Sequence, residues 1–163
     1  MNQYVISLSY GPLRKVNTYN GYVVNGYKFH TDSYGSDRAT INSGVCIKGI
    51  NYSTSESDYY GVLQEIIELE YLGLPLKRTV LFNCQWYHPT PNVGTVVHPV
   101  YNIIDVNTRR KYAKYEPFIL AAQAHQVYFC TYPSKRRDKI NWVAVCKVTA
   151  RSDVDFLETS TSE

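Results

Sequence analysis

Residues 58–89, DYYGVLQEIIELEYLGLPLKRTVLFNCQWYHP, constrain the fold more than any other part of the sequence. The first half of this stretch fits two periods, because its apolar residues recur at helical spacing and also alternate with Glu68 and Glu70. Its many β-branched and aromatic residues favour strands, and Gly73–Pro75 is a turn signal. We therefore expect two long antiparallel strands, the second over Lys77–Tyr87, with the glutamates on a solvated face.

Shorter apolar runs separated by turn residues surround this pair of strands. Asn25 and Gly26 form the dipeptide typical of a type I′ hairpin, and Pro117 has the fixed φ that favours the start of a short helix over FILAAQA. Further strands are expected over residues 44–50, 100–106, 125–133 and 141–150. This pattern predicts a mainly β fold, either a small barrel with one short helix or a sandwich.

The length of 163 residues suits one domain with a hydrophobic core. We expect this domain to span residues 1–152, with a Tyr-, Gly- and Asn-rich part at 1–57 and the barrel core at 58–152. Residues 51–58 are predicted to form a polar loop. The acidic residues 153–163 are expected to be a flexible tail.

Positive charge is concentrated in the second half of the sequence. Residues 77–151 contain twelve Lys or Arg and three Asp or Glu, whereas both flanking segments are net acidic. Such a segment is typical of a surface for nucleic acid or an acidic partner, and also of a solubilising surface, and both interpretations stay open. Two basic loops interleaved with tyrosines hold the candidate phosphate contacts, which are Arg109, Arg110, Lys111, Lys114, Lys135, Arg136, Arg137 and Lys139.

The four cysteines, at positions 46, 84, 130 and 146, lie in or beside apolar runs and form no CxxC pair. This placement is typical of buried thiols in strands and of a reducing compartment. Cys84 and His88 have a permissible ligand spacing, but a structural zinc site needs two more ligands, so we expect no metal and no cofactor. The sequence shows no signal peptide and no membrane-spanning run, which predicts an intracellular protein without a membrane partner.

No catalytic motif is recognisable. The sequence has no GxSxG elbow, no glycine-rich phosphate loop and no loop cysteine beside a histidine. Asp105 follows an apolar run, as a metal-binding carboxylate of a nuclease would, but a turn-forming residue at a strand end has the same appearance. We therefore expect a protein that is not an enzyme, with a metal-dependent nuclease as the remote alternative.

The hexapeptide CQWYHP, residues 84–89, ends the second long strand. Alternation places Cys84 and Trp86 on one face of the strand and Gln85 and Tyr87 on the other. Trp86 suits the core, yet its position at the strand end also suits the wall of a ligand site. The candidate ligand pocket comprises Tyr59, Tyr60, Trp86, Tyr87 and His88.

Several blocks of the sequence resemble a known family, in the same order: YNGYVVNGYKFHT, DYYGVLQEIIELEY, VLFNCQWYHP, EPFILAAQAHQVYF and YPSKRRDKINWVAVCKV. Over roughly residues 10–152 the chain is similar to the uncharacterised domain of plant CACTA (En/Spm-type) transposon proteins, which accompanies the transposase region. This resemblance implies a plant, transposon-derived, nuclear protein, and it supplies no established activity.

The order of strands also resembles bromo-adjacent homology domains, which are barrel-based chromatin modules. That resemblance implies an SH3-like or bromo-adjacent-homology-like β-barrel, in which aromatic rings can cage a methylated lysine. The matching positions are Tyr59 or Tyr60 and Trp86, and the family's third ring corresponds to His88. The chain departs from the family's cage at that last position.

Together these observations predict a non-enzymatic binding module that contacts DNA, chromatin such as a histone peptide, or a nuclear protein partner. A structural or assembly role stays open as well. In that role the tyrosine-rich N-terminal part mediates self-association or docking to a transposase.

Overall fold

The computed structural model describes residues 3–38, 41–49, 58–113, 117–133, 137–151 and 156–158, and within them the fold is mainly β, as predicted. The strands are β1 (Asn17–Tyr19), β2 (Gly21–Val24), β3 (Tyr27–His30), β4 (Gly44–Ile47), β5 (Tyr59–Tyr71), β6 (Lys77–Tyr87), β7 (Thr95–His98), β8 (Ile103–Asn107), β9 (Lys111–Tyr112), β10 (Phe118–Leu120), β11 (His125–Thr131), β12 (Trp142–Lys147) and β13 (Phe156–Glu158). The short helical segments are α1 (Gln3–Ser9), α2 (Asp32–Gly35) and the 3-10 turns η1 (Ala121–Gln123) and η2 (Arg137–Lys139).

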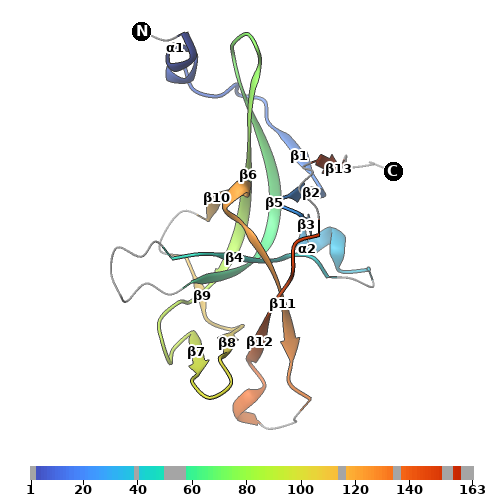
Figure 1. Cartoon of the computed structure of the whole chain (residues 1–163), viewed down its shortest axis with the longest axis vertical. Coiled ribbons are helices and arrows are strands. Elements are labelled where there is room, and N and C mark those ends of the chain that lie inside the picture. The colour runs from blue at the N-terminus through green and yellow to red at the C-terminus, as the bar shows by residue number, and fades with distance from the viewer. Residues whose placement is uncertain are drawn as a thin grey trace.

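In these described residues ten strands form one curled antiparallel sheet, which makes about half of a barrel (Figure 1). Its strand order is β10-β6-β5-β4-β11-β12-β8-β7, with β1 paired to β5 and β9 paired to β6. A smaller sheet has the order β13-β2-β3.

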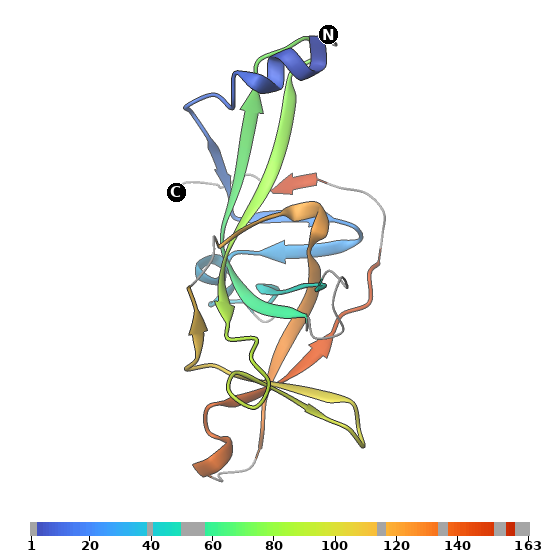
Figure 2. The ribbon, with the colours of Figure 1, turned by 90° about the vertical axis from the view of Figure 1, so that its left-hand side faces the viewer.

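The two long strands expected from the sequence are confirmed as the β5–β6 hairpin. Gly61 lies opposite Trp86 near the body, and Tyr71 lies opposite Lys77 near the turn. The outer part of the hairpin, residues 69–79, projects from the body as an arm, and α1 lies beside its tip (Figures 1 and 2). Because a strand pair that leaves the body loses the cover of a second layer, the arm ends in exposed leucines, among them Leu74.

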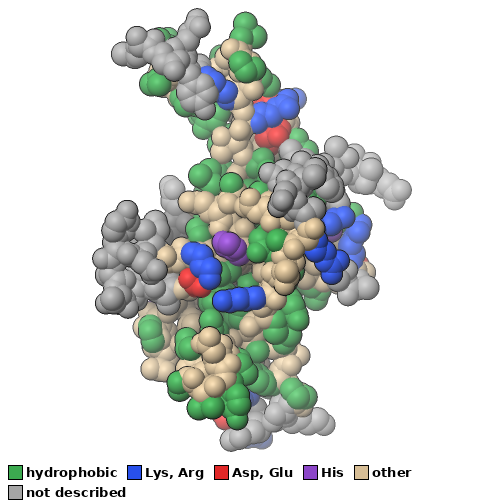
Figure 3. Space-filling view, in the orientation of Figure 1, with side chains coloured by type: hydrophobic (Ala, Val, Ile, Leu, Met, Phe, Trp, Pro, Cys, Tyr) green, Lys and Arg blue, Asp and Glu red, His purple; other side chains and the backbone are tan. Residues whose placement is uncertain are grey.

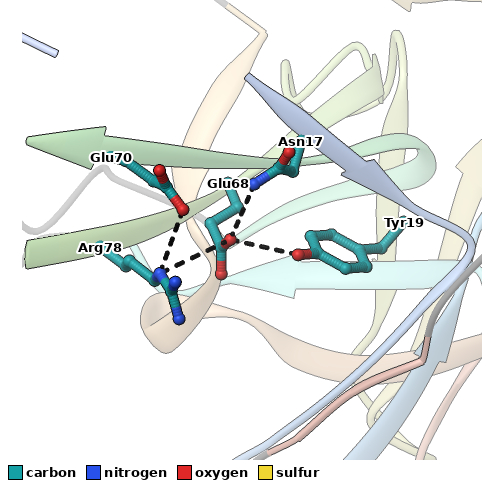
Figure 4. Close-up of polar contacts among 5 residues, drawn as sticks. All are labelled: Asn17, Tyr19, Glu68, Glu70 and Arg78. Carbon is teal, nitrogen blue, oxygen red and sulfur yellow. Dashed lines mark hydrogen bonds and ion pairs between the residues drawn. The ribbon is translucent and has the colours of Figure 1, made fainter. Parts of the chain in front are cut away.

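The expectation that the β5 glutamates form a solvated face is wrong for Glu68, which is buried. β1 pairs with β5 at this point and covers the carboxylate. Oε1 of Glu68 accepts hydrogen bonds from Nδ2 of Asn17 at 3.3 Å and from the hydroxyl of Tyr19 at 3.1 Å (Figure 4). Nε of Arg78 lies 4.0 Å from the same oxygen and 3.2 Å from Oε1 of Glu70. A buried carboxylate needs such partners, and they fasten β1 to the base of the arm.

The strands expected over residues 125–133 and 141–150 are confirmed as β11 and β12, and the strand expected over residues 44–50 is present as β4. The strand expected over residues 100–106 begins instead at Ile103. Residues 99–102 form the turn that joins β7 to β8, with Asn102 at a φ of 53°. A short polar side chain tolerates this left-handed conformation, and the turn therefore includes the first residues of the expected strand, which begins later than its composition suggested.

The helix predicted after Pro117 is wrong. Residues 118–120 form β10, which pairs with β6 from Leu81 to Asn83, and only the 3-10 turn η1 follows. Pairing with the open edge of β6 satisfies the backbone of this segment, so the tertiary context overrides its helical preference. Ala121 and Ala124 are buried at that turn.

The N-terminal part contains the predicted hairpin of β2 and β3. Asn25 and Gly26 have φ values of 51° and 75°, as the two central residues of a type I′ turn require. β13 pairs with β2 and belongs to the segment that was expected to be a flexible tail. Residues 153–155 and 159–163 of that tail, and 51–57 of the predicted polar loop, lie outside the described part of the chain.

Two hydrophobic clusters lie on opposite faces of the curled sheet. The first contains Phe29, Leu63, Phe82, Cys84 and Trp86 together with five other residues, and the β2–β3 hairpin covers it. The second contains six residues, namely Cys46, Tyr60, Tyr87, Val106, Val127 and Val143. The predicted alternation of CQWYHP is confirmed, because neighbouring positions 86 and 87 enter different clusters while Gln85 is exposed. In the described part of the chain, no helix has the length and apolar character needed to cross a membrane.

Candidate nucleic-acid interface

Two basic loops that are separate in the sequence meet at one end of the sheet. The first is the turn between β8 and β9, and the second contains η2 and leads into β12. β8 pairs with β12, so Asn107 lies opposite Trp142 at the point where both loops begin. The backbone nitrogen and the hydroxyl of Thr108 both donate to the carbonyl oxygen of Asn141, at 2.8 and 3.1 Å. These bonds join the loops directly. We call the described residues 107–111 and 137–141 the basic end.

A buried carboxylate anchors the basic end to the sheet. Asp105 lies within β8, and its side chain is fully buried. It accepts hydrogen bonds from the hydroxyl of Tyr132 at 2.5 Å, from Nε2 of His98 at 2.9 Å and from Nζ of Lys139 at 3.1 Å. The donors come from β7, from the residue after β11 and from η2, so one carboxylate connects three segments. The interpretation of Asp105 as a turn-forming strand terminus is therefore wrong.

The pKa values in this network reflect its hydrogen bonds. Burial alone would raise the pKa of Asp105, but the bonds from Tyr132, His98 and Lys139 outweigh burial and hold that pKa below its usual range. The hydrogen bond to the carboxylate, with partial burial, raises the pKa of Tyr132 to about 12. Asp105 is therefore ionised at neutral pH, and it offsets the positive charge that Lys139 brings to the loop.

The predicted phosphate contacts divide into three groups. Arg109, Arg110 and Arg137 are exposed, and within the described residues none of them forms a salt bridge. Two lysines have internal partners instead, because Lys139 binds Asp105 and Nζ of Lys111 lies 4.4 Å from the centre of the Tyr87 ring. The remaining three predicted contacts, Lys114, Lys135 and Arg136, lie outside the described residues. In the described residues, the basic end thus exposes three arginines that form no salt bridge.

The structure separates the residues of the predicted aromatic pocket. Tyr60 and Tyr87 are buried in the second cluster, and Trp86 is buried in the first, where its Nε1 donates to the carbonyl oxygen of Pro117 at 3.1 Å. Tyr59 and His88 each lie close to the ring of Tyr112, which the pocket prediction omitted. Tyr112 has its centroid 6.3 Å from Tyr59 and 5.2 Å from His88. Three of the five residues therefore belong to the core, on two faces of the sheet.

Sequence reasoning missed the roles of His98, Tyr132 and Tyr112. Asp105 could have indicated the roles of His98 and Tyr132, because a single acid in the apolar run YNIIDV needs hydrogen-bond partners if the strand is buried. Tyr112 had no such signal, because its place depends on the short pairing of β9 with the end of β6. Among the residues that the structure describes, no group of three or more His, Cys, Asp or Glu side chains could hold a metal ion.

A family model described as "Domain of unknown function (DUF4216)" matches residues 67–145. No curated protein and no solved structure matches the chain. The matched residues run from the arm through most of β12, and they contain both basic loops and Asp105 with its three partners. Over this half of the chain, the protein is similar to the DUF4216 family.

Proposed function

We propose that this domain is a non-enzymatic binding module that contacts the phosphates of DNA through the basic end. The observation that carries the proposal is the direct joining of the two basic loops by Thr108 and Asn141. Residues some 30 positions apart in sequence thereby present their positive charge on one end of the sheet. A solubilising surface would not require the loops to be bonded to each other or to a buried carboxylate.

The chemistry of the three exposed arginines fits phosphate. A guanidinium group is planar, keeps its charge at all relevant pH values and can donate two parallel hydrogen bonds to a phosphate. Arg109 and Arg110 lie in the turn that follows β8. Oδ1 and the carbonyl oxygen of Asn107 accept from the backbone nitrogens of Arg109 and Arg110, each at 3.1 Å. The backbone at the first loop is therefore ordered before any ligand arrives, which lowers the entropic cost of binding.

The basic end consists of a turn and a 3-10 segment, and neither is a helix or a two-stranded ribbon that could enter the major groove. Phosphate contacts position a protein on DNA without reading its sequence. We therefore expect binding that is weakly specific and strongly salt-dependent. The resemblance to transposon-associated domains supports DNA as the ligand and the nucleus as the site of action.

The experiment measures binding to a labelled duplex of about 30 base pairs at low salt, where phosphate contacts dominate affinity. The test variant carries Arg109→Ala, Arg110→Ala and Arg137→Ala, and we expect it to lose most of the affinity. The matched control removes the same charge from exposed positions elsewhere, with changes at Arg14, Lys15 and Arg151. If both variants lost the same amount of DNA affinity, the basic end would act only through the net charge of the protein, and the proposal would then be wrong.

A second candidate function, self-assembly, is favoured by the exposed apolar tip of the arm. Leu72, Leu74 and Leu76 are 61%, 103% and 45% exposed, and α1 beside them exposes Val5 and Leu8. Figure 3 shows hydrophobic side chains at the tip of the molecule as well as at its opposite end. Contiguous exposed apolar surface often marks a site of protein association.

The N-terminal tyrosines, which were the sequence-based candidates for assembly, are less available than the arm. Tyr19, Tyr22 and Tyr27 are partly buried against the first hydrophobic cluster. Assembly through the arm predicts oligomers in sedimentation that dissociate when Leu72, Leu74 and Leu76 are changed to serine. A wild-type protein that stays monomeric at high concentration would remove this candidate and leave the DNA-binding proposal unaffected.

A further inference from the structure

Two cysteines face each other across β11 and β12. In this antiparallel pair Cys130 lies opposite Ala144, and Cys146 lies opposite Tyr128. The two thiols are therefore diagonal neighbours on one face of the sheet, where side chains of adjacent strands can touch. Their sulfur atoms are 3.1 Å apart, and both cysteines are free thiols.

The separation of the sulfur atoms is only about 1 Å longer than a disulfide bond of about 2.04 Å. Both strands continue beyond the pair, with Thr131 opposite Val143 and Val127 opposite Lys147. Because the two cysteines are diagonal neighbours, closing this gap needs a slight approach of the two strands together with side-chain rotation.

Accessibility separates this pair from the other two cysteines. Cys130 and Cys146 are half-buried, whereas Cys46 and Cys84 are each only 2% exposed. Burial raises the pKa of the Cys46 thiol to about 11 and raises that of Cys84 as well, which keeps both in the unreactive protonated form. The hydrogen bond with Cys146, with partial burial, raises the pKa of Cys130, so reaction of the pair is expected to accelerate as the pH rises.

We propose that Cys130 and Cys146 are a dithiol modification site that is reversibly oxidised to an intramolecular disulfide by a small disulfide such as oxidised glutathione. One thiolate attacks a glutathione sulfur, forms a mixed disulfide and releases one glutathione thiolate. The second protein thiolate then attacks the protein sulfur of that mixed disulfide and releases the second glutathione. Two protein thiols lose two protons and two electrons, and one glutathione disulfide is reduced to two glutathione molecules.

The disulfide would cross-link the two strands that carry Tyr132 and the second basic loop. The second thiol lies 3.1 Å from the first, so its attack on the mixed disulfide is intramolecular and needs no encounter with a second molecule. The mixed disulfide is therefore expected to be converted to the intramolecular disulfide and not to accumulate. Oxidation of this thiol pair does not depend on DNA binding.

The test equilibrates the native protein in reduced and oxidised glutathione, stops exchange with acid, alkylates the remaining thiols under denaturing conditions and identifies the products by mass spectrometry. We expect the wild type to lose two hydrogens, with Cys130 and Cys146 protected from alkylation and Cys46 and Cys84 alkylated. Reduction with dithiothreitol should restore all four thiols.

The single variants Cys130→Ser and Cys146→Ser distinguish a paired site from two independent thiols. Each should carry a glutathione adduct on its remaining partner cysteine, with a disulfide fraction at least about tenfold below that of the wild type. A wild type that accumulates glutathione adducts, disulfide-linked dimers, bridges to Cys46 or Cys84, or no oxidation at all would overturn the proposal.

Discussion

Replacing Asp105 by asparagine keeps the shape of the side chain and removes its negative charge. The wild-type carboxylate is fully buried and accepts hydrogen bonds from Tyr132, His98 and Lys139. Asparagine has one acceptor oxygen, and its amide group would meet donors instead of acceptors. The substitution should therefore weaken the anchor of the basic end without leaving a cavity.

The expected cost follows from the contacts. A hydrogen bond to a charged group contributes about 1.5–3 kcal/mol, and removing one partner of a buried ion pair costs about 3–5 kcal/mol. The side chains of His98 and Lys139 are 37% and 33% exposed, so water can solvate them after the change, which reduces the loss. We expect the free energy of unfolding to fall by about 2–4 kcal/mol.

Urea unfolding at neutral pH, followed by the fluorescence of Trp86 and Trp142, measures this loss. Asp37→Asn is the matched control, because Asp37 is exposed and the same charge is removed. The control should change the free energy of unfolding by less than about 0.5 kcal/mol. If Asp105→Asn behaved like the control, the buried network would not hold the basic loops, and the reasoning from its hydrogen bonds would be refuted.

Three further predictions concern the body of the fold. Because hydrogen bonds lower the folded-state pKa of Asp105, its contribution should be complete above the unfolded-state pKa of about 3.9 and disappear as the pH falls through the folded-state value. The free energies of unfolding of the wild type and of Asp105→Asn, measured in urea, should thus converge in acid. A difference that stayed constant with pH would contradict a lowered pKa for Asp105 in the folded state. Gly94→Ala should cost about 1–3 kcal/mol, since an added Cβ would lie 1.9 Å from the carbonyl oxygen of His88. Thermal unfolding measures this cost. The control is Gly35→Ala, where an added Cβ would meet nothing within 4 Å, and equal unfolding midpoints for the two variants would contradict the predicted clash at Gly94. Trp86→Phe should destabilise by about 1–2 kcal/mol, as it removes a buried hydrogen bond to a backbone carbonyl; an unchanged urea midpoint would argue against a core role.

The parts of the fold that could be predicted from sequence are those determined by local patterns. Residues 77–87 are rich in β-branched and aromatic side chains and follow a turn signal, and they form a strand with the predicted bounds. Asn25 and Gly26 favour φ above zero by their own chemistry, so their hairpin needed no tertiary information.

The errors lie where a distant segment determines the outcome. The run after Pro117 becomes β10 because the edge of β6 is open to it. Glu68 is buried because β1, some 50 residues earlier, pairs across it. Asp105 is a network centre because three segments bring donors to it. None of these pairings leaves a periodic signal in the sequence.

The candidate site shows the same division. Clustered charge revealed both basic loops, but only the fold shows that Thr108 joins them to Asn141 and that Lys139 is engaged by Asp105. The aromatic pocket failed to assemble because strand alternation sends Trp86 and Tyr87 to opposite clusters. That alternation was readable from the sequence, and it argued against a pocket that used both rings.

The salt dependence of DNA affinity shows whether the basic end contacts phosphates. Fluorescence anisotropy would give the dissociation constant at several salt concentrations for the wild type and for the triple variant at Arg109, Arg110 and Arg137. Each lost phosphate contact should reduce the slope of log affinity against log salt by about 0.9, so three lost contacts predict a slope smaller by about 2.7. An unchanged slope, or no DNA binding by the wild type at low salt, would contradict the assignment of the basic end as a phosphate-binding surface.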